Sequence, residues 1–101
     1  MQYLGGLRGA GNLTCGHETV GRVAYDFDGY LMKHGQVTSC GEIRMPPEAL
    51  KELFGRTDLQ LITDDGRALS IRFSEKRLLP ASDAAHVNVA GELPLASEWR
   101  H

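Results

Sequence analysis

The chain has few of the features that would identify a membrane, secreted or cofactor-binding protein. Its 101 residues include only 2 cysteines and 4 prolines, and no apolar stretch approaches the ~20 residues of a membrane-spanning helix. The N-terminal region is rich in glycine and lacks a continuous apolar segment of signal-peptide length. Because the chain starts with Met and carries no export signal, we expect reduced thiols, no membrane association and a cytoplasmic location. The compact length and the lack of targeting suggest a bacterial source.

Neither sign of charge dominates. The 11 Lys and Arg residues and 13 Asp and Glu residues are interspersed, and the formal net charge is -2. Nucleic-acid binding driven by counterion release generally requires a basic excess, so this class is disfavoured. With 42% hydrophobic residues, the chain can form one modest core without a metal or cofactor. We expect a single domain over residues 1–101, with residues 92–101 as a loosely packed or mobile tail.

Alternation of apolar and polar residues predicts a mainly β fold. The glycines up to Gly21 predict short strands and turns at the N-terminus, and the alternation of residues 23–27 predicts a strand. Asp28-Gly29 is typical of a two-residue hairpin turn that would pair Phe27 with Tyr30. A third strand over residues 37–45 should contain a bend or bulge at Gly41. We predict a small antiparallel barrel or sandwich of six or seven strands.

One segment, about 47–54, has the pattern of a short helix. Pro47 suits the first helical position, Glu48 suits the positive end of the helix dipole, and Gly55 suits the C-terminal stop. About two turns cannot persist alone in water, so the helix must be held by packing against the sheet.

The second predicted hairpin is defined by the parity of its apolar positions. Leu59 and Leu61 must share a face with Leu69 and Ile71, and all four positions are odd. A two-residue loop would pair odd with even positions, whereas a three-residue loop over residues 64–66 pairs Leu61 with Leu69. This loop requires a left-handed backbone at its glycine. A last strand around residues 87–89 should end at a glycine.

The densest group of metal-ligand types is two cysteines and two histidines, namely Cys15, His17, His34 and Cys40. Zinc accepts such ligands, but structural zinc sites bring cysteines in pairs two to four residues apart, and this chain does not. We therefore expect no metal and consider these four residues weak candidates.

Chemistry based on histidine is a second possibility. His86 and Asn88 would project from the same face of one strand and are the weak candidates for ligand binding. An enzyme or metal-dependent protein could also be assembled from His17, His34, His86 and nearby carboxylates. No catalytic constellation is recognisable, so we expect the protein not to be an enzyme and assign no catalytic residue and no cofactor.

Three functions from different classes follow, in order of preference. The first is a non-catalytic binding or protein-interaction module whose protein partner is unknown, or one that self-associates through a sheet edge at residues 35–45. The second is the small enzyme described above. The third is single-stranded nucleic-acid binding through the basic residues on and after the second hairpin, namely Arg67, Arg72, Lys76 and Arg77.

Overall fold

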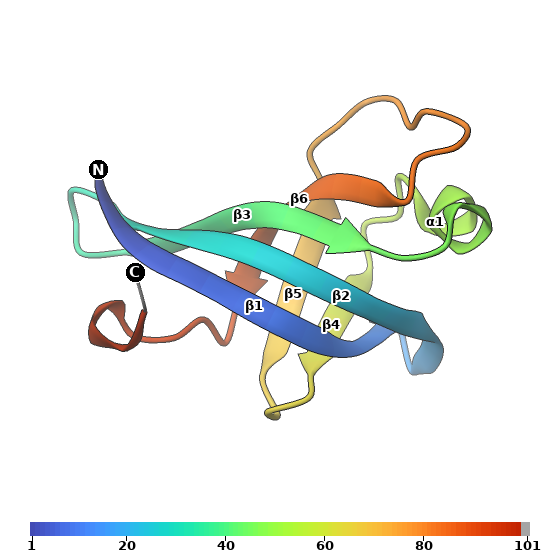
Figure 1. The fold of residues 1–101 in the computed structure, drawn as a ribbon. Coiled ribbons are helices and arrows are strands. Elements are labelled where there is room, and N and C mark those ends of the chain that lie inside the picture. The colour runs from blue at the N-terminus through green and yellow to red at the C-terminus, as the bar shows by residue number, and fades with distance from the viewer. Residues whose placement is uncertain (100–101) are drawn as a thin grey trace.

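A computed structural model describes residues 1–99 and shows a closed antiparallel barrel of six strands in the order β1-β2-β3-β6-β5-β4 (Figure 1). The strands are β1 (Gln2–Cys15), β2 (Glu18–Leu31), β3 (Val37–Arg44), β4 (Leu59–Thr63), β5 (Ala68–Phe73) and β6 (Ala84–Gly91). Helix α1 (Pro47–Leu53) connects β3 to β4, and a short 3-10 helix, η1 (Ala96–Glu98), follows β6. The structure confirms a small antiparallel barrel with one short inserted helix.

The core occupies the interior of the barrel and is built from the alternate residues of each strand. The largest fully buried side chains are Phe27, Leu13, Ile43, Leu50, Leu59, Leu61, Leu69, Ile71 and Val87. Because successive side chains of a strand point to opposite faces, one apolar residue in two is sufficient to fill the interior. Leu50 and Leu53 are the buried residues of α1, and they hold this short helix against the barrel.

The β4–β5 hairpin has the predicted loop. Leu61 faces Leu69 and Leu59 faces Ile71, and Gly66 has a φ of +94°. The N–H of Thr63 donates to the carbonyl oxygen of Arg67 at 2.9 Å and closes the turn. The pairing of Leu61 with Leu69 and the left-handed backbone of Gly66 therefore confirm the predicted three-residue loop.

The predicted hairpin at Asp28-Gly29 is wrong. Strand β2 continues through these residues to Leu31, and Phe27 pairs with Leu7 on β1 and Gly41 on β3. The chain reverses later, at residues 33–35, where the N–H of Met32 donates to the carbonyl oxygen of Gln36 at 2.8 Å. Gly35 has a φ of +79°, so this turn uses the same three-residue loop as the β4–β5 hairpin.

The N-terminal glycines do not break the chain into short strands and turns, as the composition predicted. Strand β1 is 14 residues long. An added Cβ at Gly11 would lie 2.4 Å from the carbonyl oxygen of Ile62, and one at Gly41 would lie 2.1 Å from that of Asp26. Strand β3 also keeps one register through Gly41, so the predicted bulge is absent. These two glycines allow neighbouring strands to approach closely where the barrel is tightly curved.

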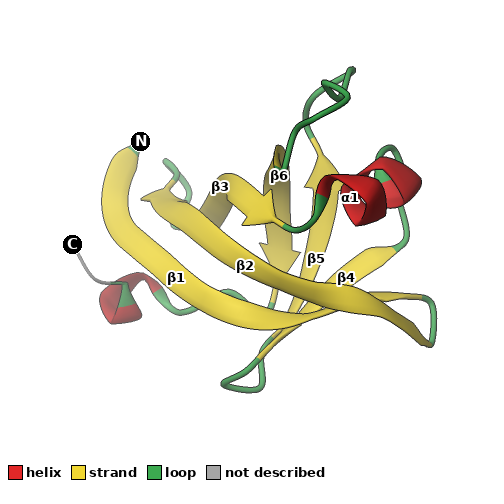
Figure 2. Cartoon of the chain, turned by 45° about the vertical axis from the view of Figure 1, so that its right-hand side comes forward, coloured by secondary structure: helices red, strands yellow, loops and turns green. Residues whose placement is uncertain are grey.

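Strands β1 and β2 extend past the barrel at the end that contains the N-terminus, and residues 92–99 lie there (Figure 2). Trp99 is only 7% exposed, and its indole lies directly against Gly29, where an added Cβ would be 2.6 Å from the ring. Its Nε1–H donates to the carbonyl oxygen of Pro94 at 3.1 Å. Within the predicted tail, Trp99 is therefore packed against β2, whereas Leu95 is 71% exposed. Residues 100–101 lie outside the described part of the chain.

Residues 35–45 do not form the exposed sheet edge that the sequence suggested. Strand β3 pairs with β2 over residues 37–44 and with β6 over residues 39–44. An open edge exists instead on β1. Gly11–Cys15 pair with β4, whereas Gly6–Gly9 have a partner strand only on the β2 side in the described structure.

Candidate binding pocket

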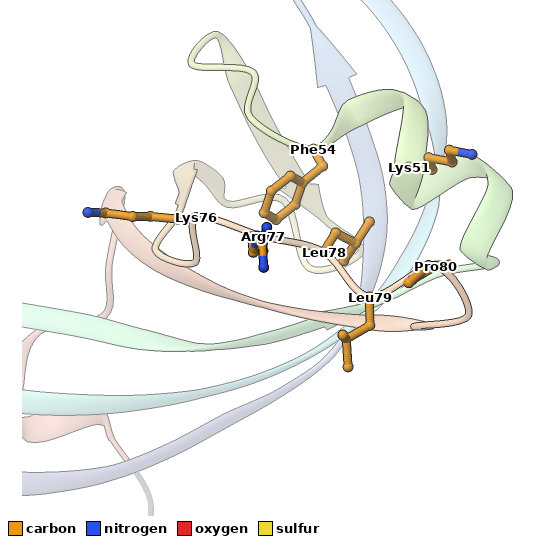
Figure 3. Close-up of a pocket in the computed structure, with 7 residues that line it drawn as sticks. All are labelled: Lys51, Phe54, Lys76, Arg77, Leu78, Leu79 and Pro80. Carbon is orange, nitrogen blue, oxygen red and sulfur yellow. The ribbon is translucent and has the colours of Figure 1, made fainter.

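A cavity of about 500 Å³ lies between the end of α1 and the segment that connects β5 to β6. Its lining combines apolar and basic side chains, namely Lys51, Phe54, Lys76, Arg77, Leu78, Leu79 and Pro80, and contains no carboxylate. Figure 3 shows Phe54 pointing from the end of α1 toward the 76–80 segment, while the side chains of Lys51 and Lys76 extend away from Phe54 on opposite sides. We call this cavity the basic pocket.

Local sequence explains how the two walls of the basic pocket are held. Helix α1 ends at Leu53, and the N–H of the following residue, Phe54, donates to the carbonyl oxygen of Leu50 at 2.9 Å. The Phe54 ring packs on Phe73 of β5 with 4.9 Å between ring centroids. In the opposite wall, the N–H of Ser82 donates to the carbonyl oxygen of Leu79 at 3.0 Å. One side of the pocket is therefore an aromatic ring that is packed against the barrel, and the other side ends in a hydrogen-bonded turn.

The cations of the basic pocket differ from five arginines elsewhere in the chain. Five arginines form ion pairs with carboxylates, namely Arg8, Arg22, Arg44, Arg56 and Arg67. Within residues 1–99, no carboxylate forms an ion pair with Lys33, Lys51, Arg72, Lys76 or Arg77. Three of these five unpaired cations, Lys51, Lys76 and Arg77, line the basic pocket. The charge left without an internal partner is therefore concentrated there.

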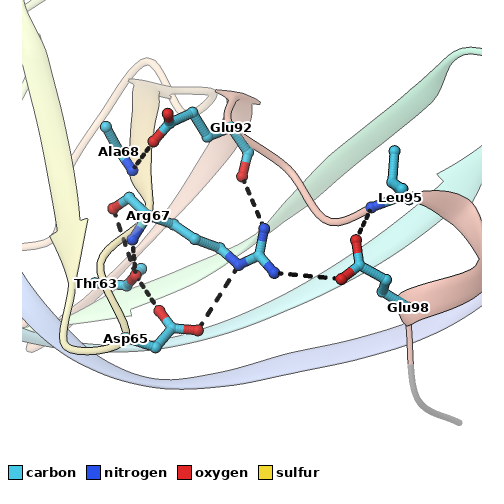
Figure 4. A network of polar contacts seen from close by, with 7 residues as sticks. All are labelled: Thr63, Asp65, Arg67, Ala68, Glu92, Leu95 and Glu98. Atoms are coloured by element: carbon cyan, nitrogen blue, oxygen red, sulfur yellow. Dashed lines mark hydrogen bonds and ion pairs between the residues drawn. The ribbon is translucent and has the colours of Figure 1, made fainter.

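The predicted nucleic-acid residues do not form one surface. Arg67 lies at the β4–β5 turn, where it forms ion pairs with Asp65 and Glu98 and donates to the carbonyl oxygen of Glu92 at 3.4 Å (Figure 4). Lys76 and Arg77 follow the other end of β5, and Arg72 lies between on its outer face. Two of the four candidates therefore belong to the basic pocket, and Arg67 has a structural role.

His86 and Asn88 project from the outer face of β6, as predicted, but their surroundings differ. The Ser74 hydroxyl lies 2.7 Å from Nδ1 of His86, and the Ser74 N–H donates to the carbonyl oxygen of His86 at 3.0 Å. Glu75 Oε1 accepts a hydrogen bond of 2.8 Å from the N–H of His86. These contacts close the end of β5 against β6. Asn88 is exposed between Cys40 and Arg72 on the neighbouring strands.

The four metal-ligand candidates lie in two distant groups. Cys15 and His17 are at the β1–β2 turn, whereas His34 lies in the β2–β3 turn, at the other end of the 14-residue strand β2. Cys40 faces Asp28, near that second end. No group of three His, Cys, Asp or Glu residues within residues 1–99 could hold a metal ion. These four residues cannot surround one ion because the length of β2 separates the two pairs.

Cys15 has a carboxylate partner that lowers its reactivity. Its Sγ lies 3.1 Å from Oδ2 of Asp58, and this hydrogen bond raises the pKa of the thiol. The same bond, together with Arg56, lowers the pKa of Asp58. The thiolate is the reactive and metal-binding form, so Cys15 is held in the unreactive form at neutral pH.

Sequence reasoning missed Lys51, Phe54 and Leu78 as site residues. Lys51 and Phe54 are three positions apart and therefore share a face of the helix, which was a usable signal. The approach of Leu78 to this face depends on the path of the 74–83 connection, and no periodicity encodes that path.

Comparison with known proteins gives this chain no relative: no family model, curated protein or solved structure matches it. Within the described residues, no helix has the length and apolar character needed to cross a membrane.

Proposed function

We propose that this protein is a small non-catalytic interaction module that binds an acidic peptide segment of a partner protein in the basic pocket. The observation that carries this proposal is that Lys51, Lys76 and Arg77, none with a carboxylate partner in residues 1–99, line a largely apolar cavity. A bound carboxylate would form charge-assisted hydrogen bonds with these cations. Other arginines of the chain already form such contacts with carboxylates of the chain itself. Phe54 and Leu78 would cover an apolar side chain next to that carboxylate.

The positions of the histidines favour this proposal over a small enzyme. His17 and His34 lie in turns at opposite ends of β2, and His86 is on the barrel wall. General acid–base chemistry requires such groups within hydrogen-bond reach of one reacting centre. The pair of Ser74 and His86 is the arrangement most similar to a catalytic one. The Ser74 N–H also donates to the carbonyl oxygen of His86, so the pair has a structural role in joining the end of β5 to β6.

The test uses the whole chain and a fluorescein-labelled peptide, Glu-Glu-Leu-Phe-Glu-Glu, with Gln-Gln-Leu-Phe-Gln-Gln as its uncharged match, in a fluorescence polarisation titration. We expect only the acidic peptide to bind and its affinity to fall as salt rises. The double variant Lys76→Ala/Arg77→Ala should weaken binding by about 2- to 30-fold, from ~0.2–1 kcal/mol for each exposed ion pair.

The matched control is Lys33→Ala/Arg72→Ala, which removes two unpaired cations outside the basic pocket. It should leave the affinity unchanged. Equal weakening by both double variants, or equal binding of both peptides, would contradict the assignment. Tighter binding of an oligothymidylate than of the acidic peptide would favour the single-stranded nucleic-acid function instead.

A further inference from the structure

The N-terminal half of β1 presents an open strand edge. The carbonyl oxygen of Ala10 accepts a hydrogen bond of 3.0 Å from the N–H of Asp64, so the backbone of Ala10 faces the β4 side. Successive residues of a strand direct their backbone groups to alternate sides, so Arg8 and Gly6 also face this side. Strand β4 pairs only with residues 11–15, and these two backbones have no strand partner in the described structure.

The open edge lacks most of the devices that protect natural edges. Residues 6–10 contain no proline and no lysine, and their register with β2 is regular. The one irregularity is the register shift between Tyr3 and Gly5, which limits the flat part of the edge to the residues that follow it. An edge of this kind pairs readily with another strand.

We propose that this edge joins two copies of the chain through antiparallel pairing of their β1 strands about a twofold axis at Leu7. In this register Gly6 of each copy faces Arg8 of the other. Both residues direct their backbone groups to the edge, so each pair exchanges two N–H···O hydrogen bonds. The same patch then serves both copies, as a twofold dimer requires.

Side-chain charge favours this register. Pairing about Arg8 would place the two arginines opposite each other, and like charges directly opposite are destabilising. Pairing about Leu7 places Arg8 over Gly6 of the second copy, which has no side chain. Gly6 is adjacent to Asp28 on β2, so the arginine can reach Asp28 of the second copy across the glycine. Its present partner is Asp26 at 3.1 Å, and its side chain is 79% exposed and free to turn.

The interface is distinct from the basic pocket. Figure 1 shows the N-terminal end of β1 at the end of the molecule away from α1, which forms one wall of that pocket. The dimer can therefore form or fail independently of peptide binding. With few hydrogen bonds and a small area, we expect a weak dimer that assembles only at high protein concentration.

The test is sedimentation equilibrium of the full chain from about 1 µM to about 1 mM, the range in which a weak dimer is detectable. We expect a monomer at the lower limit and a dimer at the upper limit. Hydrogen exchange of the Gly6 and Arg8 amides should be fast at low concentration and slower at high concentration. A monomer at the highest concentration would overturn the proposal, and so would a dimer in which both amides still exchange fast. Either result would do so even if an added extended peptide bound to the edge.

Two substitutions at Gly6 make the test specific. An added Cβ there meets only the carbonyl oxygen of Phe27 at 3.7 Å, so both variants should fold, and a thermal melt checks this. Gly6→Lys places a like charge opposite Arg8 and should weaken the dimer, whereas Gly6→Glu should strengthen it. General charge repulsion predicts the reverse, since the net charge of -2 moves toward zero with Lys and away from zero with Glu. Ala90→Lys and Ala90→Glu, on an exposed position of β6, are the matched controls.

Discussion

The contact between Trp99 and Gly29 joins the last described residue to the C-terminal part of β2. An indole of this kind buries about 150–250 Å². At ~25 cal/mol per Å² the burial contributes about 4–6 kcal/mol, and a compact denatured chain reduces this value by about 10–40%. Trp99→Ala should therefore lower the free energy of unfolding by about 2–5 kcal/mol.

Gly29→Ala perturbs the same contact from the other side. The three atoms nearest to an added Cβ all belong to the Trp99 ring, at 2.6–2.7 Å. The ring must move, at a cost of about 1–3 kcal/mol. In a Trp99→Ala background those three atoms are absent, and the same substitution should cost little. The double variant should therefore be less destabilised than the sum of the single variants by about 1–3 kcal/mol.

Urea denaturation followed by circular dichroism measures all four proteins. With m of about 1–3 kcal/mol per M, Trp99→Ala should lower the urea midpoint by about 1–5 M. Trp99 is the one tryptophan of the chain, so its fluorescence should shift to the red in Gly29→Ala. Additivity of the two single changes within about 0.5 kcal/mol would refute the proposed contact.

Four further outcomes follow. Gly41→Ala, which forces a Cβ against the backbone of β2, should cost at least ~1–3 kcal/mol and more than Gly66→Ala, where only the left-handed backbone is strained; equal urea midpoints would contradict this. Asp58→Asn should speed alkylation of Cys15 at neutral pH, measured by mass spectrometry, because the carboxylate that raises the thiol pKa is lost. Arg22 lowers the pKa of Asp64, so this carboxylate stabilises the fold above its unfolded pKa of ~3.9 and loses that effect as pH falls; Asp64→Asn should be less stable than the wild type at pH 7, and the difference should vanish in acid melts. A strong chelator should leave the melting temperature unchanged, and stoichiometric zinc in protein purified without added metal would contradict this.

Local rules were sufficient where the contacts are close in sequence. The β4–β5 hairpin follows from the shared parity of Leu61 and Leu69 and from the need for a glycine in its loop. Helix α1 follows from its apolar spacing and from Pro47, although Pro46 supplies no side-chain cap. The same parity argument applied to Phe27 and Ile43, both odd and both buried, would have excluded the two-residue loop at Asp28-Gly29. Gly35 would then have marked the left-handed position of a three-residue loop.

The basic pocket was only half visible in the sequence. Lys76 and Arg77 stood out as a basic pair, but their grouping with Arg67 followed sequence proximity. The strand between them places Arg67 at the opposite end of β5, among carboxylates. Phe54 lies beside Lys76 and Arg77 only because α1 packs across the end of the barrel where β5 ends.

Composition, alternation and turn residues by themselves determined a single antiparallel β domain with one short helix and one correctly aligned hairpin. Barrel closure, the open edge of β1 and the basic pocket were decided by the tertiary structure. The clearest case is Gly29, which resembles a turn residue beside Asp28 but lies within strand β2, where the indole of Trp99 occupies the place that a side chain would take. A glycine that permits a turn and one that permits a close approach have the same local pattern. The partner that distinguishes them is 70 positions away, and only the folded chain brings it into contact.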